Sequence, residues 1–90
     1  MENDSILMAY YKKCKANLDS PIALDMCDTL FVRSEKAGNR RLMAIAKCLK
    51  LDYYYYKNDE ENILKSVKEA KLISRKYNQL KYYYFAWGSR

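Results

Sequence analysis

Hydrophobic residues recur every three or four positions over most of the chain, which is the spacing of one face of an α-helix. The longest such pattern follows Asn39, and its first stripe consists of Leu42, Ile45, Ala46, Leu49, Tyr53 and Tyr56. A second apolar stripe beside it consists of Ala44, Cys48, Leu51 and Tyr55. Two stripes predict a helix that is buried on more than one side, with Arg41, Lys47 and Lys50 on a narrow exposed face.

A second helix is expected to fold back on this one at Lys57 and Asn58. Asn58 followed three residues later by Glu61 has the spacing of a capping box, in which Asn58 caps the new helix. The residues expected on its buried face are Ile63, Ser66, Val67, Ala70, Ile73, Ser74 and Tyr77. The residues expected on the opposite, basic face are Lys65, Lys68, Lys71 and Arg75. Residues 39–79 are therefore predicted to form an antiparallel helical hairpin.

An earlier hairpin is predicted over residues 5–37. Asp4 is the expected cap of its first helix, which runs to Leu18 with an apolar stripe of Leu7, Tyr10, Tyr11, Cys14 and Leu18. Its second helix is expected from Pro21 to about Ala37, with Ser20 as the cap. Proline suits the first helical turn, because its missing N–H would be unsatisfied there in any case. The stripe of this second helix is Ala23, Met26, Cys27, Leu30, Ser34 and Ala37.

The two hairpins are related by an offset of forty positions, since adding forty to each residue of the stripe from Ala23 to Ala37 gives a core position of the later helix. Gly38 and Asn78, also forty positions apart, stand where helices end in a left-handed residue. Residues 80–90 begin the central helix pattern again. The sequence thus predicts an all-α fold of stacked antiparallel hairpins, a short α-solenoid of about two repeats plus the start of a third, in one domain over residues 1–90.

Tandem helix pairs with small residues on their packing stripes resemble tetratricopeptide repeats. The segments Leu51-Asp-Tyr-Tyr-Tyr-Tyr-Lys-Asn-Asp-Glu-Glu-Asn62 and Lys81-Tyr-Tyr-Tyr-Phe-Ala-Trp-Gly88 resemble the helical-repeat sensor regions of bacterial signalling regulators. Those regions precede a histidine kinase or a DNA-binding output domain, so the resemblance implies a protein–protein interaction scaffold in a two-component or transcriptional regulator. The period of forty departs from the usual 34 or so and leaves HEAT-type repeats, at about 40–47, open. Neither family brings catalytic residues.

The repeat pattern stops about three turns into its last helix, so we expect the ninety residues to be a fragment of a longer array or to end where another chain covers them. Tyr83 and Trp87 would lie on the uncovered face of this helix, and we predict self-association there. Tyr54 is the third candidate protein-binding residue, because a run of four tyrosines wraps all round a helix. Packing of those rings against the next hairpin is the alternative explanation.

The net charge of +6 makes a basic nucleic-acid-binding module the main alternative function. The basic face that contains Lys65 and Arg75 is its best candidate surface. A solvated outer helix face explains the same residues, and eleven acidic residues, Asp25, Asp28 and Glu69 among them, interrupt the basic surface. We therefore expect a protein or peptide partner and only weak binding to nucleic acid.

Residues that could carry chemistry are few. The three cysteines, Cys14, Cys27 and Cys48, lie on apolar stripes without CxxC spacing, and the chain has no histidine. This indicates buried reduced thiols rather than a metal site, although a Cys14–Cys27 bridge stays open. The acidic run at residues 59–61 suits a helix start, and the serines have no histidine to activate them. We predict neither an enzyme nor a cofactor.

Compartment is left unassigned by the sequence. No apolar run approaches the roughly 18 residues that a membrane-spanning helix needs, so no membrane segment is expected in these residues. No secretory signal peptide is recognised. Unpaired cysteines favour the cytoplasm, whereas the periplasm stays open if the chain is part of a membrane sensor.

Overall fold

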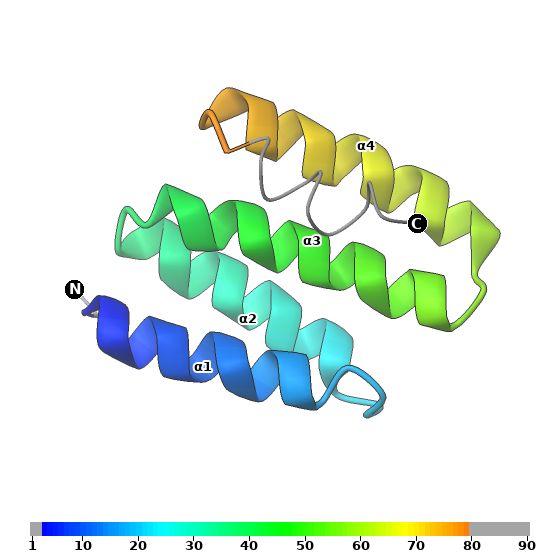
Figure 1. Cartoon of the computed structure of the whole chain (residues 1–90), viewed down its shortest axis with the longest axis horizontal. Coiled ribbons are helices and arrows are strands. Elements are labelled where there is room, and N and C mark those ends of the chain that lie inside the picture. Colours follow the sequence, from blue (N-terminus) through cyan, green and yellow to red (C-terminus); the bar gives the residue numbers. More distant parts are fainter. Residues whose placement is uncertain (1–2, 80–90) are drawn as a thin grey trace.

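The computed structural model describes residues 3–79, and these form four α-helices (Figure 1). The helices are α1 (Asp4–Ala16), α2 (Ala23–Lys36), α3 (Arg40–Tyr56) and α4 (Glu60–Lys76). No strand occurs within the described range. The all-α fold class is confirmed, as are the interruptions expected near residues 19–21, 38–39 and 57–59.

The helices lie side by side in an open row. α1 packs on α2 and also touches α3, α2 packs on α3, and α3 packs on α4. Among the described helices, the backbone of α4 comes close only to that of α3. Figure 1 shows α1 and α4 on opposite sides of the molecule with α3 between them. In a closed four-helix bundle the first and last helices would meet, and here they do not.

Buried side chains form two clusters that share α3. The first core cluster joins α1, α2 and α3 and consists of Cys14, Met26, Cys27, Leu30, Ala46 and Leu49. The second core cluster joins α3 and α4 and consists of Cys48, Leu51 and Ala70, with Ile63 and Val67 packed against it. Because α3 contributes to both, the prediction of a helix buried on more than one side is confirmed.

The predicted stripes of α3 are wrong at its last turn. Tyr55 is 40% exposed and Tyr56 is 68% exposed, although both were expected to be buried. α3 runs beyond the start of α2 in Figure 1, so its final turn projects past one of the two helices that cover the rest of it. Met43, which belonged to neither predicted stripe, is buried instead.

A left-handed residue ends α2, α3 and α4 in the same way. Gly38, Asn58 and Asn78 have φ angles of 70°, 54° and 58° and follow one another at twenty-residue intervals. At each of these joints the next backbone N–H donates to the carbonyl oxygen five residues earlier, which is the hydrogen bond of a Schellman motif. The expected positions of Gly38 and Asn78 are confirmed. The left-handed residues that end α2, α3 and α4 therefore recur every twenty residues, which is half of the predicted forty-residue offset.

Replacing Gly38 by alanine is expected to lower the free energy of unfolding by about 1–2 kcal/mol, because a side chain disfavours the left-handed conformation. The effect should report backbone strain alone, since a Cβ at Gly38 would meet no atom within 4 Å. Urea denaturation measures it. Asn58→Gly at the equivalent joint is the control and should leave stability unchanged or slightly raised. A Gly38→Ala variant as stable as the parent would show that this joint adopts another conformation.

Two helix caps lie one residue away from their expected positions. Asn3 caps α1, with its Oδ1 accepting a backbone N–H at 3.0 Å, while Asp4 is already the first helical residue. Asp59 caps α4, with its Oδ1 accepting the N–H of Asn62 at 3.3 Å. Asn58 cannot cap, because it takes the left-handed conformation that ends α3 and a cap residue is usually extended. The proposed capping box at Asn58 is therefore wrong.

The connection between α1 and α2 is longer than expected. α2 begins at Ala23 rather than Pro21, so the predicted cap at Ser20 is wrong. Ser20 instead stabilises a turn before the helix by accepting the N–H of Ile22 at 3.3 Å. α1 ends early, at Ala16. Asn17 terminates it by donating from its side-chain amide to a carbonyl oxygen of the last turn at 2.8 Å. Local hydrogen bonds from the side chains of Asn17 and Ser20 thus replace further helical turns at the end of α1 and at the start of α2.

Candidate functional site

Tyr54 is the candidate binding residue that lies in the described part of the chain. Its half-buried ring packs edge-on against Tyr53, with 5.3 Å between ring centroids. Burial raises the pKa of its hydroxyl, an effect that the nearby Lys50 opposes. Tyr54 stands four and seven positions after Lys50 and Lys47, so the three side chains follow one stripe along α3. Tyr54 is thus a partly accessible ring at the end of that stripe.

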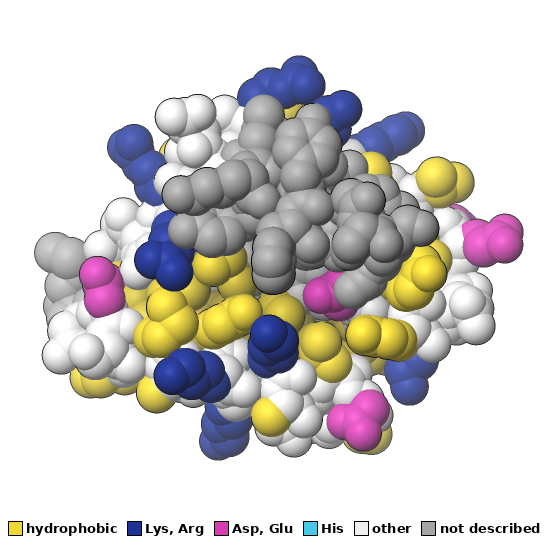
Figure 2. Space-filling model, in the orientation of Figure 1, with side chains coloured by type: hydrophobic (Ala, Val, Ile, Leu, Met, Phe, Trp, Pro, Cys, Tyr) yellow, Lys and Arg dark blue, Asp and Glu magenta, His cyan; other side chains and the backbone are white. Residues whose placement is uncertain are grey.

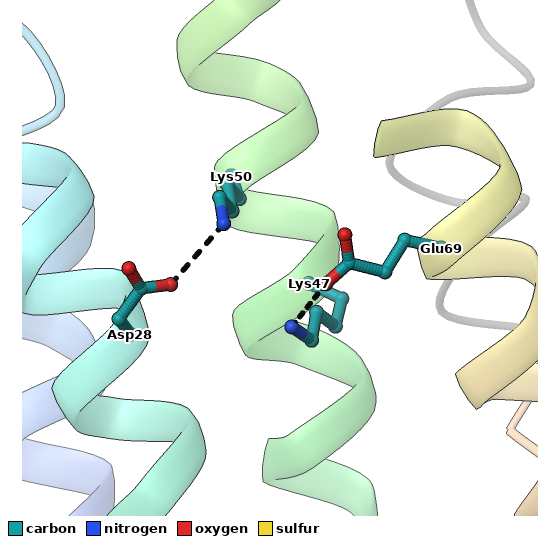
Figure 3. Close-up of polar contacts among 4 residues, drawn as sticks. All are labelled: Asp28, Lys47, Lys50 and Glu69. Atoms are coloured by element: carbon teal, nitrogen blue, oxygen red, sulfur yellow. Dashed lines mark hydrogen bonds and ion pairs between the residues drawn. The ribbon is translucent and has the colours of Figure 1, made fainter. Parts of the chain in front are cut away.

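The two lysines on this stripe, Lys47 and Lys50, connect α3 to α4 and to α2 (Figure 3). Lys50 pairs with Asp28 of α2 at 3.3 Å, and Lys47 pairs with Glu69 of α4. The Lys47 ammonium also lies 4.3 Å from the centre of the Phe31 ring. These contacts make α3 the electrostatic link between α2 and α4.

The expectation that Lys47 and Lys50 form an exposed face of α3 is wrong. Their side chains are only 15% and 22% exposed, because acidic residues of α2 and α4 meet them there. Burial lowers the pKa of Lys50, but the Asp28 carboxylate, together with Glu69 and Tyr54, outweighs this effect, and the net shift is upward. Partial burial is tolerated because each ammonium has an anionic partner.

The pair with Lys47 should make stability depend on pH. The hydrogen bond from Lys47 holds the pKa of Glu69 below its ordinary 4.5, although burial opposes the shift. A lowered folded-state pKa adds stability above the unfolded-state pKa, and this stability is lost as the pH falls through the folded-state value. Glu69→Gln should therefore cost up to about 1 kcal/mol near neutrality, a small effect because the carboxylate is 44% exposed. The cost should disappear at an acidic pH at which Glu69 is protonated in both the folded and the unfolded state.

Urea denaturation at the two pH values tests this prediction. Glu61→Gln is the matched control, because the Glu61 carboxylate is 81% exposed in its pair with Lys65. That variant should lose no more than about 0.5 kcal/mol near neutrality, the share of the helix dipole in the first turn of α4. An equal cost of Glu69→Gln at neutral and acidic pH would contradict the assigned role of the ion pair.

The other two candidate binding residues, Tyr83 and Trp87, lie outside the described residues. The C-terminal helix that was expected to carry them lies there too. Their proposed part in self-association therefore stays a prediction from sequence.

The predicted division of α4 into a core face and a basic face is confirmed. Ser66, Ala70 and Ser74 are buried against the rest of the row. The four basic residues of the opposite face are all exposed, namely Lys65, Lys68, Lys71 and Arg75. Figure 2 shows Lys and Arg side chains gathered along its upper edge, over α4.

Sequence reasoning missed two leucines on the basic side of α4. Leu64 and Leu72 are 66% and 67% exposed. Leu72 lines a shallow depression of about 250 Å³ together with Lys68, Lys71 and Arg75. The signal was present in the sequence, because the two leucines stand eight positions apart and alternate with basic residues at helical spacing.

All three cysteines are free and buried, as expected, and Cys14 and Cys27 are not bridged. The Cys14 thiol donates to the carbonyl oxygen of Met26 at 3.6 Å. Burial raises the pKa of Cys27 and of Cys48 to about 12, so both are protonated thiols at neutral pH. Thiolate chemistry is therefore disfavoured at these positions.

Neither a metal-binding cluster nor a membrane-spanning helix is found in the described part of the chain. There, His, Cys, Asp and Glu side chains nowhere gather in threes or more at a place that could hold a metal ion. The described helices also fall short of the length and apolar character needed to cross a membrane.

Comparisons of the chain with protein-family models, curated proteins and solved structures found no match. Function is therefore inferred from the chain's own residues and surfaces.

Proposed function

We propose that this chain is a protein–protein interaction scaffold built from tetratricopeptide-like helical repeats. The observation that carries the proposal is the recurrence of one joint, with Gly38, Asn58 and Asn78 at twenty-residue steps, in an open row of helices. Rows of this kind expose whole helix faces rather than a single closed pocket. Stacked helical repeats use such extended surfaces to bind other proteins.

The contact surfaces are helix faces, because the joints between α2, α3 and α4 are only three residues long. Tyr54 contributes a rigid ring that combines an apolar body with a polar hydroxyl, the kind of side chain that is enriched at protein interfaces. Tyr55 and Tyr56 extend this aromatic end of α3, with ring centroids 6.2 Å apart. We assign the chain no catalytic role.

A narrower proposal places this scaffold in the sensory region of a bacterial signalling regulator. It rests on the resemblance of residues 51–62 and 81–88 to the helical-repeat regions of such regulators. In that setting the repeats would pass a binding event to an output domain elsewhere in the protein.

Selection from a displayed library of random peptides tests the scaffold proposal, with anisotropy measurements on the selected sequences. The expected result is one or more families of related peptides with dissociation constants of about 10 μM or lower. Tyr54→Ala should weaken at least one family without changing the thermal midpoint by more than a few degrees. A library that yields no enriched family contradicts the proposal.

Labelled single- and double-stranded oligonucleotides test the alternative in parallel. Non-specific dissociation constants near about 100 μM at physiological salt are the expected result. Sub-micromolar affinity with a steep salt dependence would identify a nucleic-acid-binding module instead.

Self-association through the C-terminal segment is a separate expected outcome, since Tyr83 and Trp87 would present an apolar patch. Sedimentation should show a dimer at tens of micromolar, most simply one with two-fold symmetry. Replacing both residues by serine should give a monomer. A monomeric parent chain at the same concentration would contradict the prediction.

A further inference from the structure

The side of α4 that faces away from α3 combines exposed leucines with exposed cations. Leu64 and Leu72 are about two-thirds exposed and eight positions apart, which puts them about 12 Å apart along the helix. Lys68 stands midway between them on the same stripe. Leu72 lines the shallow depression with Lys68, Lys71 and Arg75. We call these five residues the outer face of α4.

None of the five residues of this outer face is acidic, and Glu61, the acidic residue at its N-terminal edge, pairs with Lys65. Two of the three glutamates of α4 lie in its first turn. The third, Glu69, turns toward α3 and pairs with Lys47 (Figure 3). Within the described residues, Lys68, Lys71 and Arg75 form no ion pair. The outer face therefore presents three cations that are available to an external anion.

We propose that the outer face of α4 docks an acidic, amphipathic helix of a partner protein. The proposal rests on the scaffold function and deepens it by naming one surface and the chemistry of its occupant. Leu64 and Leu72 would receive apolar side chains about two turns apart on the partner helix, as in helix-in-groove recognition. Aspartate or glutamate residues beside those anchors would pair with Lys68, Lys71 and Arg75 and set the orientation.

An acidic helix matches both components of this surface, whereas other polyanions match one. Nucleic-acid phosphates would pair with the cations but would leave Leu64 and Leu72 in water. An anionic membrane would attract the cations too, but helices that lie in membranes insert a broad apolar face rather than two separate leucines. The distribution of apolar and charged groups thus favours a protein partner.

A designed peptide probe tests the proposal on the ninety-residue chain. The probe is a fluorescein-labelled helix of about 16 residues, roughly 24 Å long, with leucines two turns apart and glutamates on their flanks. A scrambled peptide of identical composition, a single-stranded oligonucleotide and vesicles containing phosphatidylglycerol are the comparison probes. Binding is followed by fluorescence anisotropy at about 0.15 M salt, and for vesicles by co-sedimentation.

Three variants separate local recognition from general attraction. The first reverses the charges of the outer face: Lys68→Glu, Lys71→Glu and Arg75→Glu. The second reverses three exposed lysines of α1 as a matched control: Lys12→Glu, Lys13→Glu and Lys15→Glu. Both change the net charge from +6 to 0, since each substitution removes two units and +6 − 6 = 0. The third removes the leucines: Leu64→Ser and Leu72→Ser. All eight positions are exposed, so each variant should fold, which circular dichroism verifies.

The outer-face reversal should weaken binding of the acidic helix by about tenfold or more, and the leucine variant by about three- to tenfold. The control on α1 should change it by less than about twofold. Equal losses in the two charge reversals, or equal binding of the scrambled peptide, would overturn the proposal. So would tighter binding to the oligonucleotide or to the vesicles. If library-selected peptides bind all three variants as they bind the parent, the scaffold function stands and the outer face of α4 is not its site.

Discussion

Replacing Ala70 by glutamate is expected to lower the free energy of unfolding by about 3 kcal/mol or more. Ala70 has no solvent exposure and belongs to the second core cluster, where α4 approaches α3 beside Cys48 and Leu51. A glutamate there would need space that the cluster does not have and a partner for its charge. Lys47, the nearby cation of α3, is already paired with Glu69. Urea and thermal denaturation measure the loss.

Ala9→Glu is the matched control, because Ala9 is exposed on α1 and the chemical change is identical. Its effect should lie within about 0.5 kcal/mol. In an open row, loss of the second core cluster could detach α4 while α1 to α3 stay folded, so helical content should be followed together with the midpoint. An unchanged midpoint for Ala70→Glu would mean that the stripe of Ser66, Ala70 and Ser74 does not face α3.

The burial of Ala70 could be predicted from sequence because helical periodicity alone decides which side of α4 is apolar. The same reasoning assigned Leu7, Leu30 and Ser34 to the buried faces of their helices, and all three are fully buried. Such patterns depend on the geometry of one helix, and neighbours need not be known. Fold class and the approximate joints followed from this local information.

The caps show where local information becomes ambiguous. Asparagine suits both the left-handed end of one helix and the cap of the next. At the α3–α4 joint, Asn58 and Asp59 are adjacent, and either could cap by its chemistry. The structure gives the left-handed position to Asn58 and the cap to Asp59. Glycine and, after it, asparagine are the usual left-handed residues at a helix end, so the observed order satisfies both positions.

Contacts between helices were beyond the reach of periodicity. Lys47 pairs with Glu69, twenty-two positions later in the sequence, and Lys50 pairs with Asp28, twenty-two positions earlier. On a helical wheel, both lysines simply occupy the polar side of α3. Because α2 and α4 lie on either side of α3, acidic residues of both helices reach these lysines and form ion pairs with them.

The candidate site was predictable in part. The basic residues of α4 were assigned to its outer side and are exposed there, with Lys68 and Arg75 at the depression. Leu64 and Leu72 were missed, because a helical wheel averages hydrophobicity over a whole face. Four basic residues on this face outweigh the two leucines in that average. Tyr54 was selected for its place in a run of tyrosines, and the structure shows a half-buried ring whose binding role stays a prediction.

Leu30→Ala is expected to cost about 3 kcal/mol, within the usual range of 2–5 kcal/mol for this substitution in a core. Leu30 of α2 has no solvent exposure and lies in the first core cluster, where α1 and α3 pack on α2.

Ala70 stands forty residues later, at the predicted repeat offset, and an alanine is accommodated there where only α3 and α4 meet. With a third helix packed on the cluster, the walls around residue 30 cannot close, and a cavity should remain. Leu72→Ala, at 67% exposure, is the control and should change stability by less than about 0.5 kcal/mol. Urea denaturation of both variants decides the matter. A cost below about 1 kcal/mol for Leu30→Ala would show that α1 moves in to fill the space, and hence that α1 is loosely held at the edge of the row.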